Sequence, residues 1–128
     1  FFTAEPTEEE RRVYELVRQA QAAAEALVKP GVRLCDIDAA ARDVITAGGY
    51  GPYFYHRLGH FIGLQDQVGR AACGVKEKVS AAAVCFSNEP GIYLPGKFGV
   101  RIEDLVLVTE EGCEVLNRYP HELRVHAL

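Results

Sequence analysis

The chain has 128 residues, with 14 basic and 18 acidic side chains and a formal net charge of −4. Hydrophobic residues make up 48% and charged residues 25%, as in an ordinary globular domain. No run approaches the roughly 18 uncharged apolar residues that span a bilayer, and an acidic chain lacks the basic face of a nucleic-acid-binding domain. We therefore expect neither a membrane nor a nucleic acid as a partner.

Methionine is absent, even at position 1, and the first residues do not have the pattern of a signal peptide. We therefore expect that a preceding segment has been removed. Cys35, Cys73, Cys85 and Cys113 include no closely spaced pair of the kind that binds zinc or undergoes redox exchange. Reduced, mostly buried thiols in a cytoplasmic protein are the expectation.

The first part of the chain predicts two helices. Thr7 precedes three glutamates, so its hydroxyl can cap a helix while Glu10 reaches back to the Thr7 amide. Apolar residues then recur at spacings of three and four until a Lys-Pro-Gly stop, which predicts a helix over about residues 8–28. The same spacing predicts a shorter helix over residues 36–47, ended by two glycines.

The chain from residue 53 onward is typical of β-strands. Aromatic and β-branched runs predict strands over residues 83–86, 91–94, 100–108 and 113–116, with turns at 95–96, 97–99 and 111–112. Helices followed by short hairpins predict an α+β fold, in which the helices cover one face of an antiparallel sheet. Residues 65–82 have no clear periodicity. Because no repeat or linker divides the chain, we expect a single domain over residues 1–128.

Three segments place potential metal ligands on or beside the predicted strands: residues 56–60 (HRLGH), 88–91 (NEPG) and 101–104 (RIED). Each has an ordinary interpretation when taken alone. His60 alone is more often a hydrogen-bonded histidine than a ligand, and a Pro-Gly pair alone marks only a turn.

Alternation along the strand predicted over residues 100–108 places Arg101 and Glu103 on one face, which leucines continue. A carboxylate on an apolar face is costly unless it is paired or coordinated. Glu103 is therefore expected to have a partner. A salt bridge with Arg101 or another cation is the simpler interpretation, and metal coordination is the alternative.

Together, the three segments resemble the C-terminal half of the pita-bread metallopeptidases, the family of methionine aminopeptidase, Xaa-Pro aminopeptidase and Xaa-Pro dipeptidase (prolidase). The proline-specific branch is the closer match, through HRLGHFIGL at residues 56–64, FSNEPGIYLPG at 86–96 and FGVRIEDLVLV at 98–108. The resemblance covers nearly the whole chain. It implies half of a pita-bread fold, with two helices packed on a bent antiparallel sheet and the N-terminal half of the fold missing.

The resemblance also implies a dinuclear site with two divalent ions, commonly Mn, Co or Zn. By motif, His60, Glu89 and Glu103 resemble metal ligands, and Glu89 also resembles the glutamate that handles the proton of the attacking water. His56 resembles an outer histidine that shuttles protons, and Arg101 a residue that organises the substrate side. The implied reaction is hydrolysis of Xaa-Pro dipeptides or peptides, in which two cations lower the pKa of a shared water.

Two aspartate ligands of the family precede the part that this chain matches. Asp36, Asp38 and Asp43 fall in the predicted second helix, which does not line the family's metal site, so they are not expected to substitute. Two divalent ions carry four positive charges, whereas Glu89 and Glu103 supply two negative ones. We therefore expect at most one loosely held ion in this chain.

A second departure lies at Gln67, where the proline-specific branch has a histidine. Glutamine can donate a hydrogen bond but cannot shuttle a proton, which predicts weaker stabilisation of a transition state. Val68 and Gly69 also replace acidic residues, and the window 65–84 has lost the family's pattern at unchanged length.

Two readings therefore stay open. The chain is either a truncated piece of a proline-specific metallopeptidase with weak or absent activity of its own, or a catalytically silent relative that acts as a binding or assembly module. In both cases an uncovered half-fold exposes apolar surface, which predicts a symmetric homodimer or pairing with a missing N-terminal half. A scaffold without catalytic ancestry is a third, remote reading, because packing alone would then place Glu103 beside an apolar run.

Overall fold

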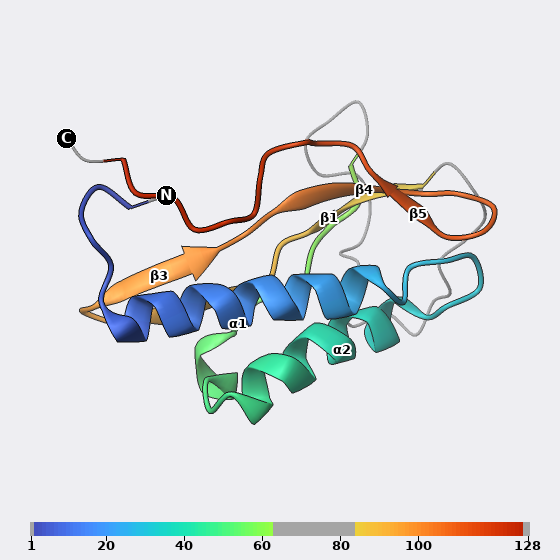
Figure 1. Cartoon of the computed structure of the whole chain (residues 1–128). Coiled ribbons are helices and arrows are strands. Elements are labelled where there is room, and N and C mark those ends of the chain that lie inside the picture. Colours follow the sequence, from blue (N-terminus) through green and yellow to red (C-terminus); the bar gives the residue numbers. More distant parts are fainter. Residues whose placement is uncertain (1, 63–83, 127–128) are drawn as a thin grey trace.

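The computed structural model describes residues 2–62 and 84–126. Two helices, α1 (Glu8–Glu25) and α2 (Leu34–Ala47), come first, and a short 3₁₀ turn, η1 (Gly51–Tyr53), follows them. The strands are β1 (Cys85–Asn88), β2 (Gly91–Leu94), β3 (Phe98–Arg101), β4 (Asp104–Val108) and β5 (Cys113–Val115). The two helices lie side by side (Figure 1): α1 packs against β1, β2 and β3, and α2 packs against α1 and η1. The expected α+β fold is confirmed. Predictions for residues 65–82 fall outside the described residues.

Helix α1 begins with the capping box that the sequence predicts. The Glu10 amide donates to Thr7 Oγ1 over 3.2 Å, and the Thr7 amide donates to Glu10 Oε2 over 2.7 Å. The helix ends at Glu25, three residues earlier than expected, because the next amides bond in tighter turns: Leu27 donates to the Ala24 carbonyl. A residue before proline avoids the helical conformation, which explains why the chain leaves the helix ahead of Pro30.

Helix α2 begins at Leu34, two residues earlier than expected. Its Ncap residue, Arg33, has no side-chain capping bond, so the pattern of Ncap residue types could not locate this start. Gly48 ends the helix, and Gly49 follows with a left-handed φ of 89°, a conformation that favours glycine.

The strand expected over residues 100–108 is in fact two strands, β3 and β4, in two different sheets. One sheet has the order β1-β4-β5 and the other pairs β2 with β3, all antiparallel. Phe98 and Gly99, expected in a turn, belong to β3. The turn is complete before them, because the Lys97 amide donates to the Leu94 carbonyl over 3.0 Å and Gly96 adopts a φ of 72°.

The two sheets share one register. Asn88 pairs with Asp104 at the end of one ladder, and Gly91 pairs with Arg101 at the start of the other. Residues 89–90 therefore lie opposite residues 102–103, and β1 to β4 form a single long hairpin whose pairing is interrupted in the middle. Pro90 has no amide hydrogen to donate, which accounts for an interruption at this point.

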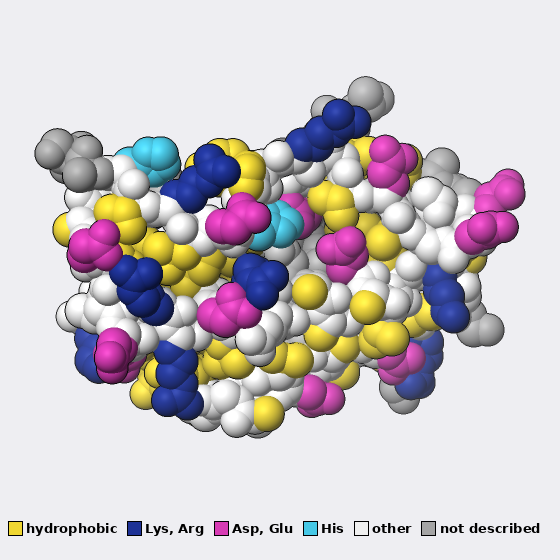
Figure 2. Space-filling view, viewed as in Figure 1, with side chains coloured by type: hydrophobic (Ala, Val, Ile, Leu, Met, Phe, Trp, Pro, Cys, Tyr) yellow, Lys and Arg dark blue, Asp and Glu magenta, His cyan; other side chains and the backbone are white. Residues whose placement is uncertain are grey.

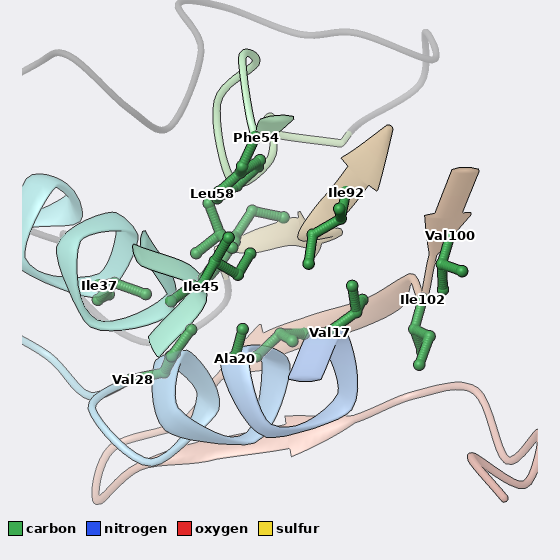
Figure 3. Close-up of a cluster of buried hydrophobic side chains, with 14 of the residues drawn as sticks. Val17, Ala20, Val28, Ile37, Ile45, Phe54, Leu58, Ile92, Val100 and Ile102 are labelled. Carbon is green, nitrogen blue, oxygen red and sulfur yellow. The ribbon is translucent and has the colours of Figure 1, made fainter. Parts of the chain in front are cut away.

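The core lies between the helices and the strands. Figure 3 shows side chains from α1, α2, the 54–58 segment and the hairpin pointing toward one another: Val17, Ala20, Ile37, Ile45, Phe54, Leu58, Ile92, Val100 and Ile102. Each of them is at least nine-tenths buried. This core fixes which face of the hairpin meets the helices and leaves the opposite face for polar groups.

Among the described helices, none is long and apolar enough to cross a bilayer. On the face shown in Figure 2, acidic and basic side chains are interspersed, without a continuous basic surface. Cys35, Cys85 and Cys113 are free thiols, but each is only partly buried, so the expected burial of the thiols is wrong for these three. Cys73 lies outside the described residues.

Candidate functional site

The segment of residues 58–62 lies along the free edge of β1 and brings His60 to the hairpin. The Glu89 amide donates to the Leu58 carbonyl over 2.8 Å, and the Ser87 amide donates to the His60 carbonyl over 2.9 Å. Gly59 permits this close approach, because a Cβ at this position would lie 1.6 Å from the Ser87 carbonyl oxygen. The glycine within the HRLGH motif is therefore required by backbone contact.

Glu89 is the centre of a polar cluster at the interruption of the hairpin. Its Oε1 lies 3.4 Å from His60 Nε2, and its Oε2 lies 3.4 Å from Arg101 Nη1. The Ser87 hydroxyl donates to Oε1 over 2.8 Å. The side chain of Glu89 is 11% exposed, so a nearly buried carboxylate is matched by one cation, one imidazole and one hydroxyl.

Glu103 has a different environment from the one that the sequence predicts. Alternation is as expected, because Ile102 and Asp104 are buried while Arg101 and Glu103 are exposed. The buried face, however, is the one that carries Ile102, so Glu103 lies on the outer face and has no ion pair with any described residue. The expected Arg101–Glu103 salt bridge is wrong, because Arg101 reaches across the hairpin to Glu89 instead.

His56 bonds to a residue that sequence reasoning missed. Its Nε2 lies 2.8 Å from the Tyr93 hydroxyl, and its Nδ1 lies 2.6 Å from the Arg57 carbonyl oxygen. Burial raises the pKa of Tyr93, and the nearby Arg101 guanidinium opposes that rise. The sequence did contain a signal for this residue: residues 89, 91 and 93 alternate along one arm of the hairpin, so Tyr93 is expected on the same face as Glu89.

Gly91, the position between Glu89 and Tyr93 on that face, leaves room for the phenol. A Cβ on Gly91 would lie 2.5 Å from the Tyr93 hydroxyl oxygen. His56, Tyr93, Arg101 and Glu89 therefore form one neighbourhood on the outer face of the bend, and His60 completes it from the neighbouring segment.

The donor groups around Glu89 suit a metal ion in kind but not in number. Imidazole and carboxylate ligands suit Mn, Co or Zn, and His60 and Glu89 do come together. Glu103 does not join them closely enough: within residues 2–62 and 84–126 there is no group of three or more His, Cys, Asp or Glu side chains that could hold a metal. The described residues thus do not form a complete metal site by themselves.

The other residues that the sequence analysis discussed lie apart from this cluster. Asp36, Asp38 and Asp43 are all on α2, as expected. Asp36 pairs with Arg33, and Asp38 pairs with Arg42. Gln67 lies outside the described residues.

The fold and the motifs around Glu89 define a class of metallopeptidase. The model of metallopeptidase family M24 matches residues 1–110, and the chain belongs to this family. Its architecture of two helices on antiparallel strands matches half of the family's pita-bread fold.

Individual relatives agree with this assignment. The chain is 46% identical over 115 residues to an uncharacterized peptidase of Staphylococcus aureus, covering 90% of this chain and 33% of the relative. It is similar to the crystal structure of dipeptidase PepE from Mycobacterium ulcerans (TM-score 0.92, 43% identity, 98% of this chain and 34% of that one). It is also similar to the crystal structure of X-Pro aminopeptidase from Thermotoga maritima (TM-score 0.91, 41% identity), with 95% of this chain and 35% of that chain covered. The chain therefore spans about a third of the length of the relatives that it matches.

Proposed function

We propose that this chain carries one part of the catalytic apparatus of an M24 peptidase that hydrolyses Xaa-Pro dipeptides or peptides. The observation that carries the proposal is the cluster of His60, Glu89 and Arg101 at the bend of the hairpin. The similarity to a dipeptidase and to an X-Pro aminopeptidase supports it. Because a prolyl amide has no N–H and a restricted backbone, its hydrolysis requires a site that matches its shape and polarises the carbonyl.

The described residues can be given roles in this function. Glu89 would accept a proton at a carboxylate oxygen, since the Ser87 hydroxyl and Arg101 hold that carboxylate in place. His56 would exchange protons with solvent while Tyr93 fixes the direction of its ring. Arg101 is half exposed, so it can present a positive charge to an anionic part of a substrate while it contacts Glu89.

A divalent ion of this family would supply an activated water, but the described residues do not make a closed site for it. Further ligands would have to join His60, Glu89 and Glu103. We therefore propose that the 128-residue chain by itself holds at most one Mn, Co or Zn ion, and holds it weakly. Hydrolysis by the chain alone should accordingly be slow or undetectable.

Equilibrium dialysis with Mn²⁺ and Co²⁺, followed by assay of Xaa-Pro dipeptide hydrolysis, tests this proposal. We expect no more than one weakly bound ion per chain, and binding at least tenfold weaker in Glu89→Gln. Glu114→Gln is the matched control, because it removes the same charge from an exposed residue of β5. The absence of any difference between these two variants would contradict the proposed role of Glu89.

A further inference from the structure

Helix α2 holds the segment that carries His56 through the side chain of Arg42. Its Nη1 donates to the Phe54 carbonyl over 2.8 Å, and its Nη2 donates to the His56 carbonyl over 3.0 Å. The guanidinium carbon also lies 4.3 Å from the centre of the Phe54 ring. A single planar group thus fixes two carbonyls, one on either side of Tyr55.

Asp38 completes this arrangement one helical turn before Arg42. Its two carboxylate oxygens accept from Arg42 Nε and Nη2, both over 3.0 Å. Its Oδ1 also accepts from the Leu58 amide over 3.0 Å. The Asp38 side chain is only 15% exposed and that of Arg42 is 35% exposed, so the pair is shielded from water more than a surface salt bridge. The backbone is therefore tied to α2 before, at and after His56.

This attachment sets where the His56 ring can lie. Phe54 meets the ring edge-on, with centroids 5.1 Å apart, and Tyr93 bonds to its Nε2 over 2.8 Å. Phe54 is itself buried under the Arg42 guanidinium. If the carbonyls of Phe54 and His56 were released, the imidazole would lose both its aromatic neighbour and its fixed distance to Tyr93.

We propose that Arg42 and Asp38 are positioning residues for His56, so that α2 contributes to the site as well as covering the core. The inference rests on the proposed function for the role of His56, but the geometry that it invokes needs neither metal nor substrate. Arginine suits this task because its planar fork serves a carboxylate and two carbonyls at once, whereas the ammonium of lysine cannot reproduce that arrangement.

The test uses Arg42→Lys and Asp38→Asn in the metal-free chain, at a temperature where both are folded. NMR would follow the ring nitrogen shifts of His56 at fixed pH and the hydrogen exchange of the Leu58 amide. We expect Arg42→Lys to move the His56 shifts toward those of an exposed imidazole and to accelerate Leu58 exchange at least tenfold. Asp38→Asn should have a smaller effect of the same kind, because its amide oxygen can still accept from Leu58.

Arg33→Lys is the matched control. Arg33 forms a two-point pair with Asp36 at the start of α2 (2.8 and 2.6 Å), and among the described residues its guanidinium makes no other hydrogen bond or ion pair. It should leave the His56 shifts and Leu58 exchange unchanged. If Arg42→Lys lowers only the melting temperature, like any structural residue, the positioning role is wrong. Equal metal binding by the Glu89→Gln and Glu114→Gln variants would instead contradict the proposed function and leave this result intact.

Discussion

Asn88 and Asp104 are cross-strand partners, and each has a buried side-chain oxygen without a hydrogen-bond donor among the described residues. The other atoms of both side chains are well bonded. Asn88 Nδ2 donates to the Gln21 carbonyl on α1, while Asp104 Oδ1 accepts from Asn117 and lies 3.0 Å from His121 Nε2. The pair thus connects the hairpin to α1 on one side and to the C-terminal segment on the other.

This arrangement predicts that Asp104→Asn is tolerated and that Asp104→Ala is not. The new amide could donate to Asn88 Oδ1 while its oxygen still accepts from Asn117. We therefore expect the free energy of unfolding of Asp104→Asn to lie within about 1 kcal/mol of that of the unsubstituted chain. Alanine would leave Asn117 and His121 without their acceptor and should cost about 3 kcal/mol. Urea unfolding at pH 7 measures both, and equal losses in the two variants would refute the explanation.

Gly59→Ala should destabilise the chain strongly, because its Cβ would collide with the Ser87 carbonyl oxygen at 1.6 Å. Backbone cannot move aside as a flexible side chain can, so we expect a loss of about 3 kcal/mol. Gly112→Ala is the control, since the nearest atom to its Cβ is the Val28 carbonyl oxygen at 4.0 Å. Thermal unfolding measures both variants, and we expect a clearly lower melting temperature for Gly59→Ala than for Gly112→Ala.

Acid sensitivity should depend partly on Glu15. Hydrogen bonds from Arg18 and then from Gln19 lower the pKa of Glu15 from 4.5 to about 2. Because the folded pKa lies below the unfolded one, ionised Glu15 stabilises the fold above about pH 4.5, and this contribution is lost as the pH falls toward 2. The side chains are nearly half exposed, so the effect should stay below about 1 kcal/mol.

In Glu15→Gln, the free energy of unfolding should therefore fall less steeply as the pH is lowered from 4.5 toward 2, as measured by a series of urea titrations. Glu114→Gln, which makes the same change of charge on β5, provides the comparison. If the slope of the free energy of unfolding against pH changes equally in both variants, the effect is due to net charge and not to the bonds of Glu15.

The outer face of the strands suggests self-association. Leu105 and Leu107 are only partly buried there, and Leu116 is 45% exposed. We expect a symmetric homodimer through this face at micromolar concentration, and Leu116→Glu should shift it toward monomer in sedimentation velocity. A monomer of the unsubstituted chain that does not bind an apolar dye would contradict this expectation.

Features encoded within a few residues were predictable from the sequence. The Thr7–Glu10 capping box forms as expected because both partners lie in one helical turn. The alternation of residues 101–104 is likewise correct, since it follows from the geometry of an extended chain. The ends of the elements were less predictable: the break between β3 and β4 lies opposite Pro90, which separates β1 from β2 on the other arm of the hairpin.

Contacts between distant segments account for what the sequence could not reveal in the site. The burial of Glu103 was misjudged because alternation defines two faces without telling which one meets the helices. Arg101 contacts Glu89 only because the hairpin places them near each other. Arg42 donates hydrogen bonds to backbone carbonyls, which every residue has. The residue types of the 54–58 segment therefore could not predict that contact.

The common register of the two ladders limits which sequence changes the hairpin from β1 to β4 can accept during evolution. Removing a single residue between Phe98 and Arg101, or adding one, would offset β4 against β1 and send Glu103 and its alternate neighbours to the opposite side. Residue exchanges can accumulate one at a time along both arms, whereas a change of length would alter all of these positions at once. Among natural variants, the two arms, residues 85–94 and 98–108, should therefore differ in composition and each keep a constant length.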